Sequence, residues 1–437
     1  MSRSRGVVGP ALARLAVVAL LAGAAVLDGA CTNGPILANA PVSRPVAPAE
    51  SIRPPALADP QPVAFPRDDA PHDRLTEWWY YTGHLRDRAT GDRYGFEFVI
   101  FRAERGDFPV SWASHVAITD EAHGRFLYAQ RASVGPAADR SATAKNGFDL
   151  ALGPAEGSAS STGSSPGSPG SPPGTQTWAM AGSGGQDHLA VGLTPAEALL
   201  AGSGGDLGLE LSLAATKPPA LHDRDGFIDF GGAGGSYYYS RTEMTAAGSL
   251  VLDGHRLDVD GAAWFDHQWG DFIAVGGGGW DWFAVNLAGG TDLTLSLVRD
   301  AGGQAALVYG TLVGPDGVAT HLPADAFSVS VTGHWTSPRT GATYPSGWRL
   351  TVPGSGLVID LTPTVSAQEL DTRATTGVVY WEGSQVVHAS RNGTPVAGEA
   401  YVELTGYASS VAAPPAPSPS GNPSAPSGSP PSASSAP

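Results

Sequence analysis

The sequence contains almost no cysteine and almost no lysine, and no long stretch of it has the apolar period of an amphipathic helix. Its single cysteine, Cys31, excludes a disulfide framework and a metal cluster built from thiolates. Its two lysines and a formal net charge of −16 leave no basic surface. Nucleic acid and anionic membrane surfaces are therefore excluded as partners, because neither would find cationic groups to bind.

The first 30 residues have the features of a secretory signal peptide. Arg3, Arg5 and Arg14 precede an uncharged apolar run over 15–27, and small residues lead to Cys31. We therefore expect residues 1–30 to be removed and the protein to be exported. Two interpretations of Cys31 stay open: lipidation, which would make a periplasmic or cell-envelope lipoprotein, and plain secretion, since Asp28 departs from the usual lipoprotein signal. A lipid anchor on Cys31 is the only membrane contact that we expect.

Three further segments are too poor in apolar residues to pack. They are a Pro/Ala-rich tether over 31–62, a flexible Ser/Gly/Pro insertion over 157–174, and a disordered Pro/Ser tail over 409–437. The remaining chain is long enough for two domains, which we place at 63–272 and 273–408. The glycine run at 276–279 is expected to be the hinge between them.

The chain between these segments is predicted to be all-β. Short runs rich in Val, Ile, Tyr, Trp and Thr alternate with Gly, Pro and Asp-Gly turn signals. One short helix is expected near Pro195–Leu200. The second half holds about eight strands, a number that closes into a barrel able to hold one small ligand.

Several aromatic motifs in a fixed order are the most specific feature of the sequence. They occupy residues 77–85, 236–240, 263–270, 279–283, 380–383 and 398–407. In this order they resemble the carotenoid 1,2-hydratase (hydroxyneurosporene synthase) family over residues 65–408, and most of all its secreted AttH-like relatives, often called predicted secreted hydrolases. The resemblance implies two tandem lipocalin-like (calycin-type) antiparallel β-barrels. It leaves the activity open, because the family includes polyene hydratases, relatives linked to pericyclic ring closure and members without a known role.

Hydration of an unactivated alkene needs a strong acid, an environment that tolerates a carbocation, and a base for the proton of water. A carboxyl group in an aromatic-lined pocket can supply the acid, because burial raises its pKa. We predict that Asp266 is the proton donor, that His267 orients the water or takes its proton, and that Asp281 is the competing acid. Because strand neighbours point to opposite faces, Asp266 and His267 can meet only across a bend.

Structural roles stand beside these catalytic ones. Packing is the favoured interpretation of the tryptophans at 78, 79, 280 and 282, and Asp266 and His267 can equally well hold a strand end or join the barrels. We expect Glu77 to pair with Arg102 or Arg241, and Glu382 and Glu403 to lie at barrel rims. The candidates for ligand contact are Trp79, Tyr81, Trp269, Trp282 and Tyr238.

Other chemistries have weaker support. The G-x-S-x-G match at 163–167 lies in the low-complexity insertion with no strand before it or helix after it, so no serine nucleophile is recognised. The histidines have no close ligand spacing, and we expect no metal and no cofactor. Two functions remain: a hydratase-like or cyclase-like enzyme acting on a long apolar ligand (isoprenoid, polyene or lipid), and a carrier that binds such a ligand unchanged. The enzyme requires Asp266 or Asp281 to line a cavity beside His267, whereas the carrier requires both acids turned outward or paired.

Overall fold

The computed structural model describes residues 60–144, 146–154, 176–231, 234–272 and 277–408. The expected signal peptide, insertion and tail, and all but the end of the tether, lie outside the described residues. The α-helix of the described part is α2 (Pro195–Ala201), close to where the sequence predicts it. Thr194 and Glu197 form its capping box, and Gly202 ends it with a φ of 87°. No helix in the described ranges is long and apolar enough to cross a membrane.

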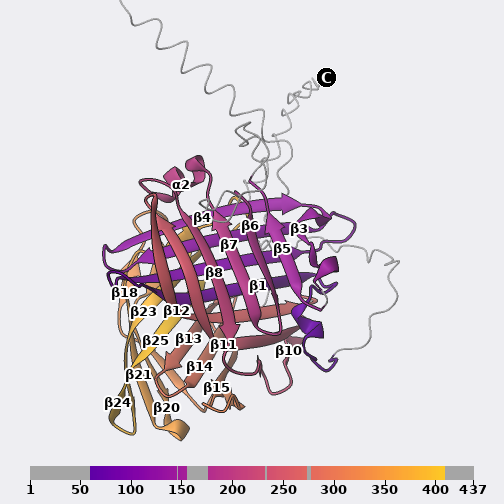
Figure 1. Cartoon of the computed structure of the whole chain (residues 1–437). Helices are drawn as coiled ribbons and strands as arrows, with labels where there is room; N and C mark the ends of the chain where they lie inside the picture. Colours follow the sequence, from indigo (N-terminus) through magenta and orange to yellow (C-terminus); the bar gives the residue numbers. More distant parts are fainter. Residues whose placement is uncertain (1–59, 145, 155–175, 232–233, 273–276, 409–437) are drawn as a thin grey trace, which may run out of the picture.

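The first sheet curls into a nearly closed barrel, in which the front strands cross the strands behind them (Figure 1). Its order is β4-β3-β2-β1-β12-β11-β8-β7-β6-β5, with β9 and β10 paired to β11. The strands are β1 (Thr76–Asp87), β2 (Arg93–Ala103), β3 (Ser111–Asp120), β4 (Arg125–Val134), β5 (Phe148–Leu152), β6 (Trp178–Ser183), β7 (Gln186–Gly192), β8 (Gly208–Ala215), β9 (Ala220–Leu221), β10 (Phe227–Asp229), β11 (Gly235–Leu252) and β12 (His255–Gly270). Short 3-10 turns accompany them at Arg67–Asp69 (η1), Pro136–Ala138 (η2) and Ser141–Thr143 (η3).

The second sheet forms a half-barrel in the order β16-β15-β14-β13-β25-β23-β21-β20-β17. The strands are β13 (Gly277–Leu287), β14 (Thr291–Asp300), β15 (Ala305–Val313), β16 (Ala319–Pro323), β17 (Ser328–Val331), β20 (Trp348–Val352), β21 (Leu357–Pro363), β22 (Glu369–Asp371), β23 (Val379–Arg391), β24 (Thr394–Val396) and β25 (Gly398–Thr405), with the separate hairpin β18 (His334–Thr336) and β19 (Thr343–Pro345). A 3-10 turn, η5, covers Pro353–Ser355. The expected all-β fold with two tandem barrels is confirmed.

Strands β11 and β12 are long and continuous. Gly248 and Gly261 lie inside them, where the partner backbone comes very close. A Cβ at Gly261 would lie 1.9 Å from the carbonyl oxygen of His84, and one at Gly248 would lie 2.0 Å from that of Glu210. These glycines therefore permit close approach between strands instead of ending them. The chain turns at Asp253-Gly254, where both φ values are positive, as a tight hairpin turn requires.

Aromatic and aliphatic side chains fill the first barrel. Trp79, Phe98, Trp178 and Phe265 are among those with no exposed surface. A void of about 10 Å³ lies inside this barrel, room for roughly one water molecule. These side chains form a packed core.

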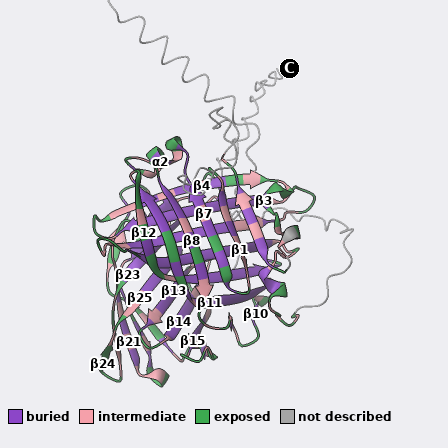
Figure 2. Ribbon diagram, viewed as in Figure 1, coloured by how far each residue is buried: buried purple, intermediate pink, exposed green. Residues whose placement is uncertain are grey.

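The two barrels pack outer face against outer face. Tyr80, Val99 and Trp264 of the first barrel contact Trp282 and Tyr401 of the second. Residues 263–270 of β12 are all buried, whereas the first half of this strand is mostly exposed (Figure 2). The side chains that point out of each barrel here enter a shared interface instead of solvent.

Candidate functional site

A cavity of about 160 Å³ lies between the two barrels. An apolar cavity of roughly this size holds one benzene-sized molecule. Aromatic rings from both sheets line it: Trp78, Tyr80, Phe101, Phe230, Tyr238, Phe272, Trp280, Trp282, Tyr309 and Tyr380. Asp266, Glu97 and Glu403 supply carboxyl groups, and neither arginine nor lysine occurs among the described lining residues.

Asp266 reaches this cavity from β12, whose outward positions face the second barrel. Three donors hold its carboxylate: the Tyr238 hydroxyl, the Ser240 hydroxyl and the Trp264 indole N–H, which lies 2.6 Å from Oδ1. Burial raises the pKa of Asp266 to about 6, although these hydrogen bonds oppose the rise. The group is thus buried, mostly ionised at neutral pH and able to accept a proton near that pH.

Further hydrogen bonds hold in place two of the groups that donate to Asp266, the hydroxyls of Tyr238 and Ser240. The indole N–H of Trp282 donates to the Tyr238 hydroxyl at 3.0 Å, and His222 Nε2 lies 2.7 Å from the Ser240 oxygen. His222 Nδ1 lies 2.9 Å from the Thr311 hydroxyl of the second barrel. Because burial lowers the pKa of His222 to about 3, this ring is neutral and links the barrels by hydrogen bonds alone.

Two glutamates share the cavity with Asp266. Glu97, on β2, accepts a hydrogen bond from the Tyr380 hydroxyl at 2.9 Å, and its other oxygen is buried with no partner among the described residues. Burial and the nearby Glu403 raise its pKa to about 8. Glu403 accepts from the Trp280 indole at 3.1 Å, and burial raises its pKa to about 7.

Glu382 lies behind these groups in the same interface, with no exposed surface. The Tyr80 hydroxyl donates to it at 2.8 Å, and its second oxygen has no partner in the described part of the chain. Burial, Glu403 and Glu97 raise its pKa well above the ordinary value. The expectation that Glu382 lies at a barrel rim is wrong, because the outer face of β23 is covered here by the first barrel. Glu403 is half-buried and lines the cavity.

His267 points into the first barrel and does not meet Asp266. Strand β12 stays extended through both residues, so they face opposite sides. His267 Nε2 lies 2.9 Å from Glu77 Oε1, and the same oxygen lies 2.8 Å from His72 Nδ1. Glu77 therefore pairs with two histidines and not with Arg102 or Arg241, which bond to Glu104 and Asp69.

The ligand atoms of His72, Glu77 and His267 lie within 4.8 Å of one another. Two imidazoles and one carboxylate form a donor set that can bind Zn²⁺ or Fe²⁺. No metal was expected from the sequence, because its histidines have no close ligand spacing. The structure brings this set together from a loop and from strands β1 and β12. In the structure, hydrogen bonds among the three side chains already satisfy Glu77, and the His72 ring stacks on Trp269 with centroids 3.9 Å apart.

Asp281 also lies away from the cavity, on the inward face of β13. Arg299 forms an ion pair with it, and the Tyr407 hydroxyl donates to it at 2.9 Å. Burial raises the pKa of Asp281, although Arg299 opposes the rise. The structure therefore does not bring Asp266, His267 and Asp281 together in one site.

The five candidates for ligand contact divide in the same way. Tyr238 and Trp282 line the cavity between the barrels. Trp79, Tyr81 and Trp269 lie in the core of the first barrel. The sequence analysis missed Glu97, Tyr380 and Tyr80, because a polar side chain at an outward strand position normally faces water.

Three comparisons place the chain among known proteins. The model of the AttH-like family matches residues 56–407. The crystal structure of an AttH candidate from Nitrosomonas europaea is 28% identical, with a TM-score of 0.64, and the match covers 79% of this chain and 98% of the other. Kievitone hydratase from Nectria haematococca has a similar fold, with 15% identity, a TM-score of 0.57, and coverage of 79% and 93%. None of the curated protein sequences matches. Because the family model spans most of the sequence, from before the first barrel to the end of the second, the chain belongs to the AttH-like family.

Proposed function

We propose that this protein is a hydratase-type enzyme acting on an apolar ligand. It adds water to a carbon–carbon double bond of the ligand, or forms such a bond by removing water. One observation carries the proposal: a single cavity places carboxyl groups of raised pKa among aromatic rings, with no opposing arginine or lysine among the described lining residues. Acid catalysis of hydration needs this combination. The similarity of fold to kievitone hydratase and the resemblance to carotenoid hydratases support it.

The reaction uses two carboxyl groups. A protonated carboxyl group gives its proton to one alkene carbon, so that the π electrons form a C–H bond and leave a carbocation on the neighbouring carbon. Aromatic faces stabilise this cation, and rings such as those of Trp78 and Trp282 are in place. A water oxygen then forms the C–O bond while a carboxylate takes the released proton. We assign Asp266 to this pair because it lines the cavity and its pKa lies near neutrality.

The cavity size limits the reacting part of the ligand. About 160 Å³ accommodates one ring or one branched five-carbon unit. A long isoprenoid or polyene would therefore place one end between the barrels, with the remainder outside. The signal-like residues 1–30 lead us to propose that the ligand is met outside the cytoplasm, in the periplasm or cell envelope.

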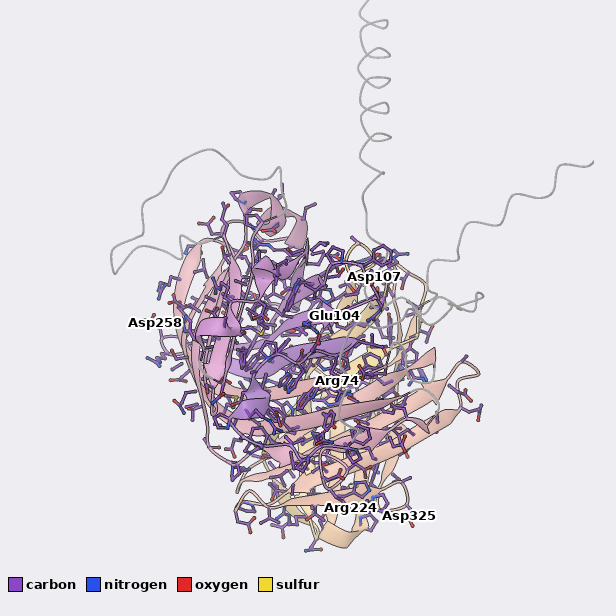
Figure 3. All side chains as sticks on the ribbon, turned by 90° about the vertical axis from the view of Figure 1, so that its right-hand side faces the viewer. Arg74, Glu104, Asp107, Arg224, Asp258 and Asp325 are labelled. Atoms are coloured by element: carbon purple, nitrogen blue, oxygen red, sulfur yellow. The ribbon has the colours of Figure 1, made fainter. Side chains whose placement is uncertain are left out.

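We expect the purified mature protein to hydrate kievitone or neurosporene in oxygen-18 water, with mass spectrometry detecting the incorporated label. Asp266→Asn should reduce incorporation by a factor of roughly 100 or more, the size typical of losing a general acid or base. Asp258→Asn is the matched control, because Asp258 lies on the same strand at the outer surface (Figure 3).

A carrier is the alternative function. The observation that favours it is that Asp266 is already held by three donors. Native mass spectrometry of the protein as purified, followed by lipid extraction, separates the two functions. A ligand recovered unaltered from both wild type and Asp266→Asn, with no oxygen-18 incorporated into either probe, would establish the carrier and remove the enzyme proposal.

A further inference from the structure

From its sequence, Asp266 is predicted to be the proton donor. The hydrogen bonds in the structure favour the opposite role for it, that of proton acceptor. We propose that Glu97 is the proton donor of the cavity and that Asp266 is the carboxylate that faces the cation and takes the proton of water. This inference rests on the proposed function and names the acid that it requires.

The hydrogen bonds of the two groups differ in kind. Both oxygens of Asp266 accept from hydroxyl or indole donors, which stabilises the ionised form. Glu97 has one donor, Tyr380, on Oε1, and Oε2 is buried without a partner among the described residues. An ionised carboxylate with a bare buried oxygen is costly, whereas a protonated carboxyl group can turn that O–H toward the cavity.

The charges around Glu97 favour the protonated form. The titratable groups that face it are Tyr80 on β1, Glu403 and Tyr401 on β25, Glu382 and Tyr380 on β23, and, beyond Tyr380, His115 on β3. His115 Nδ1 lies 2.8 Å from the Tyr380 hydroxyl, and burial lowers the pKa of His115 to about 3, so it brings no positive charge. Glu97 therefore has acidic neighbours, and no cation among the described residues stabilises its anion.

The different environments of Glu97 and Asp266 move their pKa values apart. One site can therefore hold a proton donor and a proton acceptor at the same pH. During hydration Glu97 loses its proton to the alkene carbon, and Asp266 gains one from the attacking water. Exchange with water after product release restores both groups. Tyr238, Ser240 and Trp264 hold Asp266 in place for its step.

The first test needs no substrate. At pH 7 the infrared spectrum of the wild-type protein should contain protonated-carboxyl absorption, and the difference spectrum between wild type and Glu97→Gln should show the loss of one such band. Glu382, Glu403 and Asp187, whose pKa values are also raised, account for the absorption that remains. The glutamine retains the acceptor for Tyr380 and resembles the neutral acid, so this variant should fold. Glu369→Gln is the matched control, because Glu369 is a buried carboxyl group of the second barrel held by three hydroxyl donors, and the band should persist there.

The second test measures charge in the cavity with N,N-dimethyldodecylamine, a cationic probe. At pH 7.5, Asp266→Asn should weaken its binding at least about tenfold, and Glu97→Gln should leave it nearly unchanged, because only the first substitution removes a negative charge. On the labelled-water assay both variants should lose hydration. Protonated-carboxyl absorption as strong in Glu97→Gln as in the wild type, or weaker amine binding in that variant, overturns the inference but not the proposed function. Absence of hydration by the wild type removes the proposed function itself.

Discussion

Raising the pH from 6.5 to 8.5 will lower the melting temperature of the wild-type protein by roughly 5 °C, a loss of stability on the order of 3 kcal/mol. The pKa of Glu97 is raised to about 8, and those of Glu403 and Asp187 to about 7, chiefly by burial. The unfolded chain has released these protons by pH 6.5, but the native state still holds most of them. The stability that they provide is complete at low pH and is lost as the pH rises through 7 and 8.

Differential scanning calorimetry at intervals across this range measures the effect. Glu97→Gln should show about half of the wild-type decrease, because its neutral amide cannot ionise. His115 and His222, with pKa values lowered to about 3, are neutral in the native state over this range, whereas the unfolded chain still holds about half of their protons at pH 6.5. They therefore offset less than about 1 kcal/mol of the loss. A melting temperature that stays constant or rises with pH in the wild type would show that these carboxyl groups are ionised in the native state.

Replacing Asp69 with alanine will destabilise the protein by about 3–5 kcal/mol, because the substitution leaves a buried cation without its partner. Arg241 Nη2 lies 2.8 Å from Asp69 Oδ1, and both residues are at most 4% exposed. Asp69 also accepts from the Tyr239 hydroxyl at 2.6 Å and from the Gly184 backbone N–H at 2.7 Å. This network ties η1 to β11 and to the turn between β6 and β7.

Denaturant unfolding followed by tryptophan fluorescence gives the free energy directly. Asp260→Ala, which removes the partner of Arg88 in an exposed pair, is the control and should cost less than about 1 kcal/mol. The double variant Asp69→Leu/Arg241→Met should recover much of the loss, since no unpaired charge then remains buried. Equal losses in the single and double variants would mean that the hydrogen bonds of Tyr239 and Gly184, and not the charge of Arg241, account for the effect.

The alternation of residues along strands is local and could be predicted. It placed Asp266 and His267 on opposite faces of one strand, and the structure keeps them there. This alternation could not predict which face of the strand contacts a ligand. The second half was expected to close into a barrel able to hold one small ligand, but the cavity lies between the barrels, and rings such as Trp79 and Phe265 fill the inside of the first one.

By itself, the sequence determined the strand content, the tandem barrels and the family, because each depends on residue periodicity, turn signals and motif order within the chain. Only the tertiary structure decided the site. Packing the barrels outer face to outer face turns positions that would ordinarily meet water, such as Glu97, Asp266 and Glu382, into buried acids between two sheets. Their pKa values depend on burial and on neighbours as distant in sequence as Glu97 and Tyr380, which are 283 residues apart. Local sequence patterns cannot predict such a contact. The raised pKa values of this cavity therefore arise only when the two barrels pack together.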